Sequence, residues 1–286
     1  YGVEAFGLAD QPISQLRAAT AAAAASNGSQ ACPSIGIRAL LGHEADPLAV
    51  AVRASIRWWL KTWIDYPGER PIYRKVWQVA HNSIVRSDGI VWNKVTGPIG
   101  TAIANLTRIG WACPLPDSWT DQDGTLWQVA KDAQASKSQF AEISQALVRG
   151  VTIHVNDEAS KHRFGDGIEK GVDTTVLTKH LAKLSRDHDH YGRGCLLAAA
   201  TGGLWPNARI NLVNPDHPPE CPRCGQGPQD EFHDLWDCPK VCDSLDPRIQ
   251  NTNRLAPVAR KALADRNNLC FWVRGLTPLS WFPQPR

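Results

Sequence analysis

The sequence predicts a mostly α-helical fold, because apolar residues recur at helical spacing in several segments. The clearest stripe has four-residue spacing and consists of Leu48, Val52, Ile56, Leu60 and Ile64. A second stripe lies within residues 97–111 and consists of Ile99, Ile103, Leu106 and Ile109. We find no internal repeat in the chain.

The predicted helices begin and end at residues that commonly cap or stop a helix. Asn27-Gly28-Ser29 ends the first helix, Pro67-Gly68 follows the second, and Gly110 ends the third. Asp173 is the expected N-cap of a later helix. The predicted helices cover residues 13–26, 47–64, 97–111, 136–150, 173–186 and 194–203.

The helix over 47–64 carries a basic stripe beside its apolar one. Arg53, Arg57 and Lys61 are spaced four residues apart, so they share one face of the helix. We interpret this stripe as a solvated surface, and the alternative is a face that contacts phosphate groups.

Three cysteines and one histidine form the most specific motif of the chain. The segment C-P-R-C-G-Q-G-P-Q-D-E-F-H-D-L-W-D-C contains a Cys-x2-Cys pair with Gly225 behind it, and then a His-x4-Cys pair that suits a short helical turn. Three thiolates and one imidazole fill a tetrahedral shell, which is typical of structural zinc and leaves no open position for a catalytic water. Cys221, Cys224, His233 and Cys238 are therefore the predicted ligands of a structural Zn²⁺.

Other interpretations of the cysteines stay open at this point. Cys242 is a rival for the fourth ligand position, although it lies nine residues beyond His233. A disulfide or a set of free thiols is the other alternative. Zinc-type cysteines without a disulfide framework favour a reducing compartment, which is the nucleus or the cytoplasm.

Charge is unevenly distributed, although the whole chain carries only +3. Residues 221–238 carry a net charge of −3, whereas residues 240–286 carry +5. The charge of the whole chain does not indicate nucleic-acid binding, but any contact with the phosphates of a nucleic acid is expected to come from the flanks of the motif. The candidate contact residues are Arg223, Trp236, Lys240, Arg254, Arg260 and Lys261. Trp236 and Phe232 are also candidates for stacking on bases, and packing against the metal site is the alternative for both rings.

The chain divides into five predicted segments. Residues 1–112 and 127–204 are helical, and 113–126 form a linker rich in Pro, Asp and Gly. Residues 205–242 hold the zinc knuckle, and 243–286 form a basic tail.

Several absences restrict the function. The chain contains no Met and starts with Tyr1, which predicts a fragment of a longer polypeptide or a processed product. We find no signal peptide or long uncharged apolar segment, so no membrane partner is expected. No P-loop, dinucleotide fingerprint, H-E-x-x-H or G-x-S-x-G motif occurs. We interpret the D-H-D-H run at 187–190 as a solvated helix end, and a metal site is the alternative. Because the catalytic motifs are missing, the sequence indicates a binding module and no catalytic residue is assigned.

Four segments carry a resemblance to a known family. Y-G-V-E-A-F-G-L at 1–8 is similar to a segment that follows a polymerase palm, and Y-G-R-G-C-L-L-A-A-A-T-G-G-L-W at 191–205 is similar to a helix and T-G stretch before a knuckle. The Cys-Cys-His-Cys motif with Pro239 behind it, and F-W-V-R-G-L-T-P at 271–278, complete the set. Together they resemble the C-terminal part of reverse transcriptases from non-LTR (LINE-like) retrotransposons.

The resemblance implies a helical thumb over 1–112 and a connector over 127–204, downstream of a polymerase palm. The catalytic Asp-Asp pair of that palm does not occur in this sequence, so no polymerase residue is carried over. The expected function is a non-catalytic region of an RNA-directed DNA polymerase that binds RNA or target DNA beside the upstream palm. Two alternatives remain, which are a zinc-stabilised protein-interaction module without nucleic-acid affinity and a hydrolase whose zinc has only three protein ligands.

Overall fold

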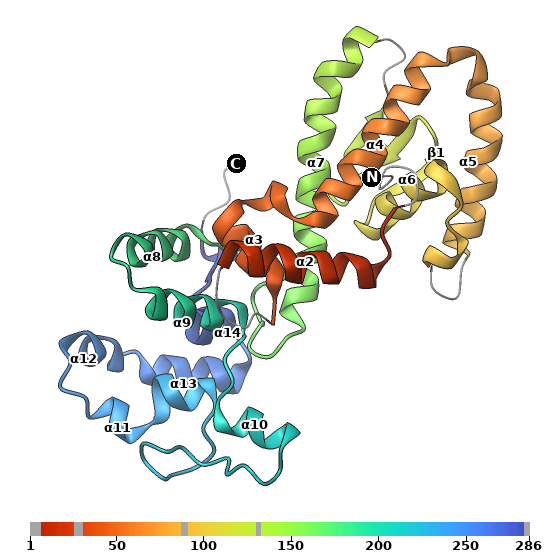
Figure 1. Cartoon of the computed structure of the whole chain (residues 1–286). Coiled ribbons are helices and arrows are strands. Elements are labelled where there is room, and N and C mark those ends of the chain that lie inside the picture. Colours follow the sequence, from red (N-terminus) through yellow and green to blue (C-terminus); the bar gives the residue numbers. More distant parts are fainter. Residues whose placement is uncertain (1–6, 26–30, 87–90, 130–132, 283–286) are drawn as a thin grey trace. The chain divides into compact units, whose positions relative to one another are not determined.

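The computed structural model is mostly helical, which confirms the predicted fold class (Figure 1). It describes residues 7–25, 31–86, 91–129 and 133–282. Most of the Y-G-V-E-A-F-G-L segment and the Asn27-Gly28-Ser29 stop lie outside the described residues.

The chain forms two compact units, and each is built from two stretches of sequence. Unit 1 comprises Tyr1–Thr20 and Leu41–Val155, and unit 2 comprises Ala21–Leu40 and Asn156–Arg286. The first and last long helices of unit 1, α2 (Asp10–Ala25) and α7 (Ala133–Ser160), continue into unit 2. This division differs from the predicted segments, because helices far apart in the sequence share one core in each unit.

Unit 1 combines helices with a small antiparallel sheet. Its other elements are η1 (His43–Ala45), α4 (Pro47–Asp65), η2 (Pro67–Glu69), α5 (Arg70–Val85), η3 (Val91–Lys94), α6 (Gly97–Arg108), β1 (Ala112–Leu115), β2 (Ser118–Thr120) and β3 (Leu126–Gln128). The strands pair in the order β1-β2-β3, and Trp119 lies opposite Trp127. Gly110 follows α6 with φ of 81°, a backbone conformation that glycine adopts without strain.

Tryptophan side chains dominate the core of unit 1. Trp59, Trp63, Trp77 and Trp119 are completely buried, and the ring centroids of Trp59 and Trp77 are 4.9 Å apart. The indole N–H groups of Trp59 and Trp77 donate to the backbone oxygens of Pro116 and Cys113 at 2.8 and 2.9 Å. The core therefore buries large aromatic surfaces without leaving these two polar groups unpaired.

The predicted linker at 113–126 is folded and belongs to this core. It contains most of the three-stranded sheet, and Cys113 and Trp119 are buried in it. Its turn residues close the hairpin, since Asp121 Oδ1 accepts hydrogen bonds from the N–H groups of Asp123 and Thr125. The strands are only three or four residues long, so turn residues dominate the composition and make the segment resemble a linker.

Unit 2 contains short helices and a two-stranded sheet. Its elements are α3 (Pro33–Leu41), β4 (Val172–Asp173), α8 (Thr175–Arg186), α9 (His190–Thr201), α10 (Asn207–Val213), η4 (His233–Asp237), α11 (Pro239–Cys242), α12 (Pro247–Asn253), α13 (Ala256–Asp265), α14 (Leu269–Arg274), β5 (Thr277–Pro278) and η5 (Leu279–Trp281). The N-cap of α8 is Thr174 and not the predicted Asp173, although the carboxylate of Asp173 accepts a hydrogen bond from the N–H of Thr175 at the start of the helix. Within the D-H-D-H run, Asp189 is the N-cap of α9.

The predicted basic tail at 243–286 is largely helical as far as the structure describes it. It forms α12, α13 and α14, and Leu269, Cys270, Val273 and Leu276 are buried. These helices contain seven, ten and six residues, so none of them shows an apolar stripe long enough to predict a helix from the sequence.

A buried arginine connects two segments that the sequence analysis selected. Arg274 lies at the end of α14 and is only 4% exposed. Its guanidinium donates to the backbone oxygen of Arg163 and contacts the thiol of Cys32 at 3.5 Å. A Cβ at Gly202 would lie 3.0 Å from its Cζ, so R-G-L at 274–276 packs directly against T-G-G at 201–203.

No described helix has the length and apolar character needed to cross a membrane.

Candidate metal centre

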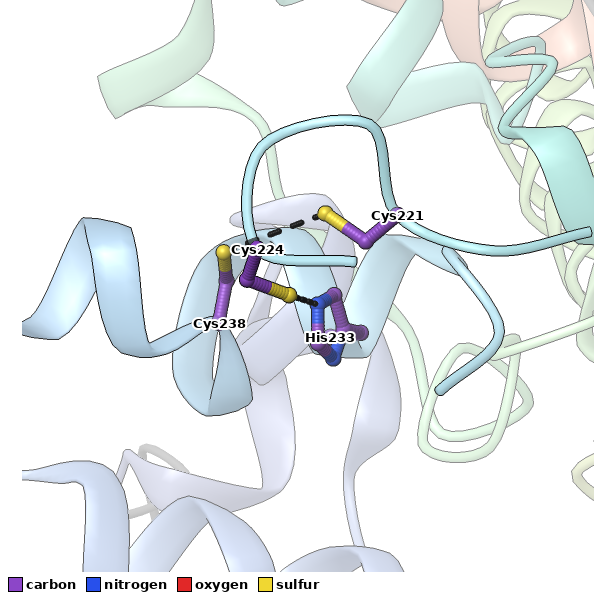
Figure 2. A group of neighbouring side chains, drawn as sticks. All are labelled: Cys221, Cys224, His233 and Cys238. Carbon is purple, nitrogen blue, oxygen red and sulfur yellow. Dashed lines mark hydrogen bonds between the residues drawn. The ribbon is translucent and has the colours of Figure 1, made fainter. Parts of the chain in front are cut away.

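The four predicted ligands converge on one point of unit 2 (Figure 2). The donor atoms of Cys221, Cys224, His233 and Cys238 all lie within 4.8 Å of one another. The sulfurs of Cys221 and Cys238 are 3.9 Å apart, and the sulfur of Cys224 lies 3.4 Å from Nε2 of His233. Cys221 and Cys238 are buried, and the other two are half-buried.

A tight loop positions the first two cysteines. The backbone oxygen of Cys221 accepts a hydrogen bond from the N–H of Gly225 at 2.8 Å. The N–H of Cys221 donates to the backbone oxygen of Gly227 at 3.1 Å. Gly225 and Gly227 have φ values of 66° and 65°, which a residue with a Cβ adopts only with strain. The two glycines therefore allow the chain to turn twice within five residues, so that both sulfurs face the same point.

A widened helical turn positions the other two ligands. The N–H of Cys238 donates to the backbone oxygen of His233 at 2.8 Å, which is the i→i+5 bond of the π-helical turn η4. An ordinary α-turn aligns residues three and four apart, whereas this turn aligns residues five apart. Asp230 starts the turn by accepting from the N–H of His233 at 2.7 Å. The His-x4-Cys spacing thus matches the geometry of η4.

The local electrostatics favours a thiolate at one of the sulfurs. Burial alone would raise the pKa of the Cys221 thiol, but the backbone amides of Cys224 and Arg223 and the side chain of His233 act against it and hold that pKa at about 7. Burial raises the pKa of Cys224, and the neighbouring sulfurs raise it further. Because thiolates are the form that binds metals, an ion at this cluster would be bound more strongly as the thiols lose their protons.

Cys242 lies apart from this donor set. Its sulfur contacts the backbone oxygen of Trp236 at 3.6 Å, and the structure groups Cys238, not Cys242, with the other three ligands. Among the described residues, the cluster is a closed set of three sulfurs and one nitrogen that can hold a metal ion.

The two aromatic candidates for base stacking are engaged inside unit 2. Phe232 is 2% exposed and packs with Ala259 and Val273. The indole N–H of Trp236 donates to the backbone oxygen of Trp272 at 2.8 Å, and the two rings meet edge to face. Both rings therefore pack beside the metal centre, which was the alternative interpretation of the sequence.

The aspartates of the knuckle are neutralised by arginines. The pairs are Asp230 with Arg163 at 3.0 Å, Asp234 with Arg223 at 3.3 Å, and Asp237 with Arg260 at 2.6 Å. Two candidate phosphate-binding residues, Arg223 and Arg260, are therefore already paired with carboxylates. Sequence reasoning missed Arg163, which lies 67 residues from Asp230 and has no local signal.

Three of the predicted nucleic-acid contacts are exposed and have no carboxylate partner among the described residues. Lys240 lies on α11, Arg254 is the C-cap of α12, and Lys261 lies on α13. None of the three forms an ion pair with another described residue. The cationic surface that follows the metal centre therefore depends on these three side chains.

Fold and site together define a helical protein whose C-terminal unit contains three cysteines and one histidine that can hold a metal ion. No family model, curated protein or solved structure matches the chain. The resemblance to non-LTR reverse transcriptases therefore still rests on sequence motifs.

Proposed function

We propose that this chain is a non-catalytic, nucleic-acid-binding region in which a structural zinc ion holds the cationic C-terminal helices in place. The parent polypeptide would be a reverse transcriptase of the non-LTR retrotransposon type, as the sequence motifs imply. The observation that carries the proposal is the convergence of three sulfurs and one imidazole directly before α11, α12 and α13.

The spacing of the donor atoms supports zinc as the ion. Zn–S and Zn–N bonds of about 2.3 and 2.0 Å at tetrahedral angles place two sulfurs about 3.8 Å apart and a sulfur and a nitrogen about 3.5 Å apart. The corresponding distances here are 3.9 Å between Cys221 and Cys238 and 3.4 Å between Cys224 and His233. Four protein ligands leave no open position for a water, which favours a structural role over a hydrolase.

The internal ion pairs support a nucleic acid as the partner. The negative charge of the knuckle would repel phosphates, but its three aspartates are paired with arginines. Lys240, Arg254 and Lys261 are exposed on the segments that follow. Such unpaired cations gain most from phosphate contact, because binding releases counterions from the nucleic acid.

A salt titration with matched charge variants tests the proposal. The zinc-loaded chain would be titrated with fluorescein-labelled 20-nucleotide single-stranded RNA and DNA, and binding would be followed by anisotropy. Replacing Lys240, Arg254 and Lys261 by glutamine is expected to lower the affinity at least tenfold. If each contacts one phosphate, the slope of log K against log salt should fall in magnitude by about 2.

A control removes the same number of charges elsewhere in unit 2. Lys179, Lys183 and Arg186 are exposed on α8, and their replacement by glutamine should leave the affinity and the salt slope unchanged. An affinity that does not respond to salt would contradict phosphate contacts, and equal losses in both triple variants would show that only net charge matters.

A protein-interaction module is the second candidate function. Leu212, Val213 and Leu245 are at least two-thirds exposed in the segments that flank the knuckle, and large apolar side chains in such positions often contact protein partners. Intact zinc binding together with no detectable RNA or DNA binding would select this function.

A further inference from the structure

A groove of about 430 Å³ lies on the surface of unit 1. Helix α4 lines it with Val50, Arg53, Arg57, Trp58 and Lys61, and α7 contributes Phe140. Helix α4 also contributes Ala54, so its lining residues follow one another at intervals of three, one, three, one and three positions and form one continuous face of the helix. The opposite face of α4 packs Trp59 and Trp63 into the core, so this surface faces away from the core.

The charge of the groove has one sign. Its lining contains three cations and no carboxylate. Arg53 is paired at 2.9 Å with Glu44, which is itself 73% exposed, and the guanidinium of Arg57 lies 5.8 Å from the ring centre of Phe140. Lys61 forms no ion pair with any residue that the structure describes.

A simple solvated surface does not explain this combination. Solvated helix faces usually mix charges of both signs, and this face has none of the negative sign. Attraction to the C-terminal end of the α4 dipole accounts for none of the three cations, because the last turn of α4 contains no basic residue. The same face keeps Trp58 half-buried and Val50 54% exposed, so it offers an apolar wall beside its cations.

We propose that this groove binds a nucleotide. Residues four positions apart are about 6 Å apart along a helix, so Arg57 and Lys61 can hold one phosphate group between them. The flat base would lie against Trp58, because aromatic rings stack on bases whatever their sequence. The volume falls within the range of about 300–1,000 Å³ that is usual for small-ligand sites. The nucleotide can be free or part of a single strand, since both present a base and a phosphate.

Calorimetric titration of the zinc-loaded chain with ATP and with inorganic triphosphate tests the assignment. The double variant Arg57→Gln/Lys61→Gln is expected to weaken the binding of both ligands at least tenfold. Trp58→Leu should weaken ATP binding several-fold and leave triphosphate binding unchanged, because only the base needs the ring. Lys75→Gln removes an exposed charge from α5 outside the groove and should change neither affinity.

The source of the nucleotide is decided by comparing thymidine monophosphate with a ten-nucleotide oligo(dT). A strand is identified if the oligonucleotide binds more than tenfold tighter than the monophosphate and the double variant loses this difference in affinity. A free nucleotide is identified if the two ligands bind with similar affinity. The proposal is overturned if wild-type protein binds neither ATP nor oligo(dT) at millimolar concentration. It is also overturned if Lys75→Gln weakens ATP binding as much as the double variant does, or if a ten-residue polyglutamate peptide displaces ATP at equal concentration.

This site is independent of the function proposed for unit 2. The triple variant of Lys240, Arg254 and Lys261 should leave ATP binding unchanged, because none of these residues lines the groove. The triple variant therefore tests the surface of unit 2, and the double variant Arg57→Gln/Lys61→Gln tests the groove. Each proposal can be contradicted while the other stands.

Discussion

The core of unit 1 and the knuckle of unit 2 are stabilised in different ways. Unit 1 has a continuous apolar core to which helices and sheet contribute, with four completely buried tryptophans. Beside the knuckle, the buried apolar cluster contains only Phe232, Ala259 and Val273. Over residues 214–230, all of which the structure describes, the chain has no helix or strand and one isolated bridge, from Glu220 to Pro228.

The difference shows where a metal ion matters for folding. A large core stabilises its helices through buried apolar surface, at about 25 cal/mol for each Å² removed from water. A short loop cannot bury enough surface to offset its loss of conformational entropy. Cys221 in that loop and Cys238 directly after η4 are both buried, and an ion bound between their sulfurs would supply the missing free energy. The folding of unit 1 should therefore not depend on a metal ion, whereas the folding of the knuckle should depend on it.

The largest expected effect is loss of the metal. Cys238→Ser, or treatment with a strong chelator, should abolish zinc binding, which contributes about 10–16 kcal/mol of folding free energy in isolated zinc-finger peptides. Hydrogen exchange is expected to show lost amide protection over residues 221–242 and unchanged protection in α4. Equal loss of protection in both regions would refute the independence of unit 1.

Cys242→Ser is the matched control for that substitution. Its thiol is only four residues from Cys238 but lies outside the donor set. The variant should retain one zinc per chain by elemental analysis and normal protection over 221–242. Loss of zinc in Cys242→Ser but not in Cys238→Ser would show that the fourth ligand has been misassigned.

The next effect concerns the core of unit 1. Trp59→Ala removes a completely buried ring and leaves the backbone oxygen of Pro116 without its indole donor. The expected destabilisation is about 3–5 kcal/mol in denaturant unfolding, with zinc content unchanged. The neighbouring Trp58 is half-buried, so Trp58→Leu should cost less than half as much. Similar costs for the two would mean that burial does not determine the stability of α4.

The sequence predicted the cysteine-histidine cluster and helices such as α4, α6 and α8 because their signals are local, whereas the sixteen-residue helix α5 was not predicted. The four ligands lie within eighteen residues, and the stripe from Leu48 to Ile64 reports directly on the buried face of α4. The sheet at 112–128 and the helices after Lys240 were missed, because their elements are too short to show a period.

The remaining differences come from contacts that sequence spacing does not encode. Arg163 reaches Asp230 across 67 residues, and Trp236 reaches Trp272 across 36. Through these contacts Arg163 neutralises an aspartate of the knuckle, and Trp236 packs inside unit 2. The charge count correctly identified the cationic flank, but it did not distinguish paired from unpaired arginines.

A smaller effect tests the contact between T-G-G and R-G-L in unit 2. Gly202 and Gly275 both end a helix, with φ of 69° and 66° and ψ of 23° in each case. Replacement by alanine costs backbone strain of about 1–3 kcal/mol at either position. Only the Cβ at Gly202 also meets the Arg274 guanidinium, so Gly202→Ala should be the more destabilising variant in thermal unfolding by about 1–2 kcal/mol. Equal costs would show that Arg274 moves aside freely.

The smallest effect is the pH dependence of the hairpin in unit 1. Burial raises the pKa of Asp121, but hydrogen bonds from Trp127 and from the amides of Thr125 and Asp123, together with the charge of Arg149, lower it more, so the pKa lies below its ordinary value of 3.8. A carboxyl group whose pKa is lower in the folded state stabilises the fold above pH 3.8, and this contribution is lost as the pH falls through the lowered pKa.

Asp121→Asn should therefore destabilise unit 1 at pH 7 by about 1–2 kcal/mol and reduce the further loss of stability below pH 4. Denaturant unfolding at pH 7 and at pH 3 would measure both changes. Asp123→Asn is the control, because that side chain is about half-exposed and pairs with Arg149 in contact with solvent, where ion pairs contribute little. If both variants showed the same pH dependence as the wild type, the buried carboxylate would not stabilise the hairpin, and the apolar core alone would account for unit 1.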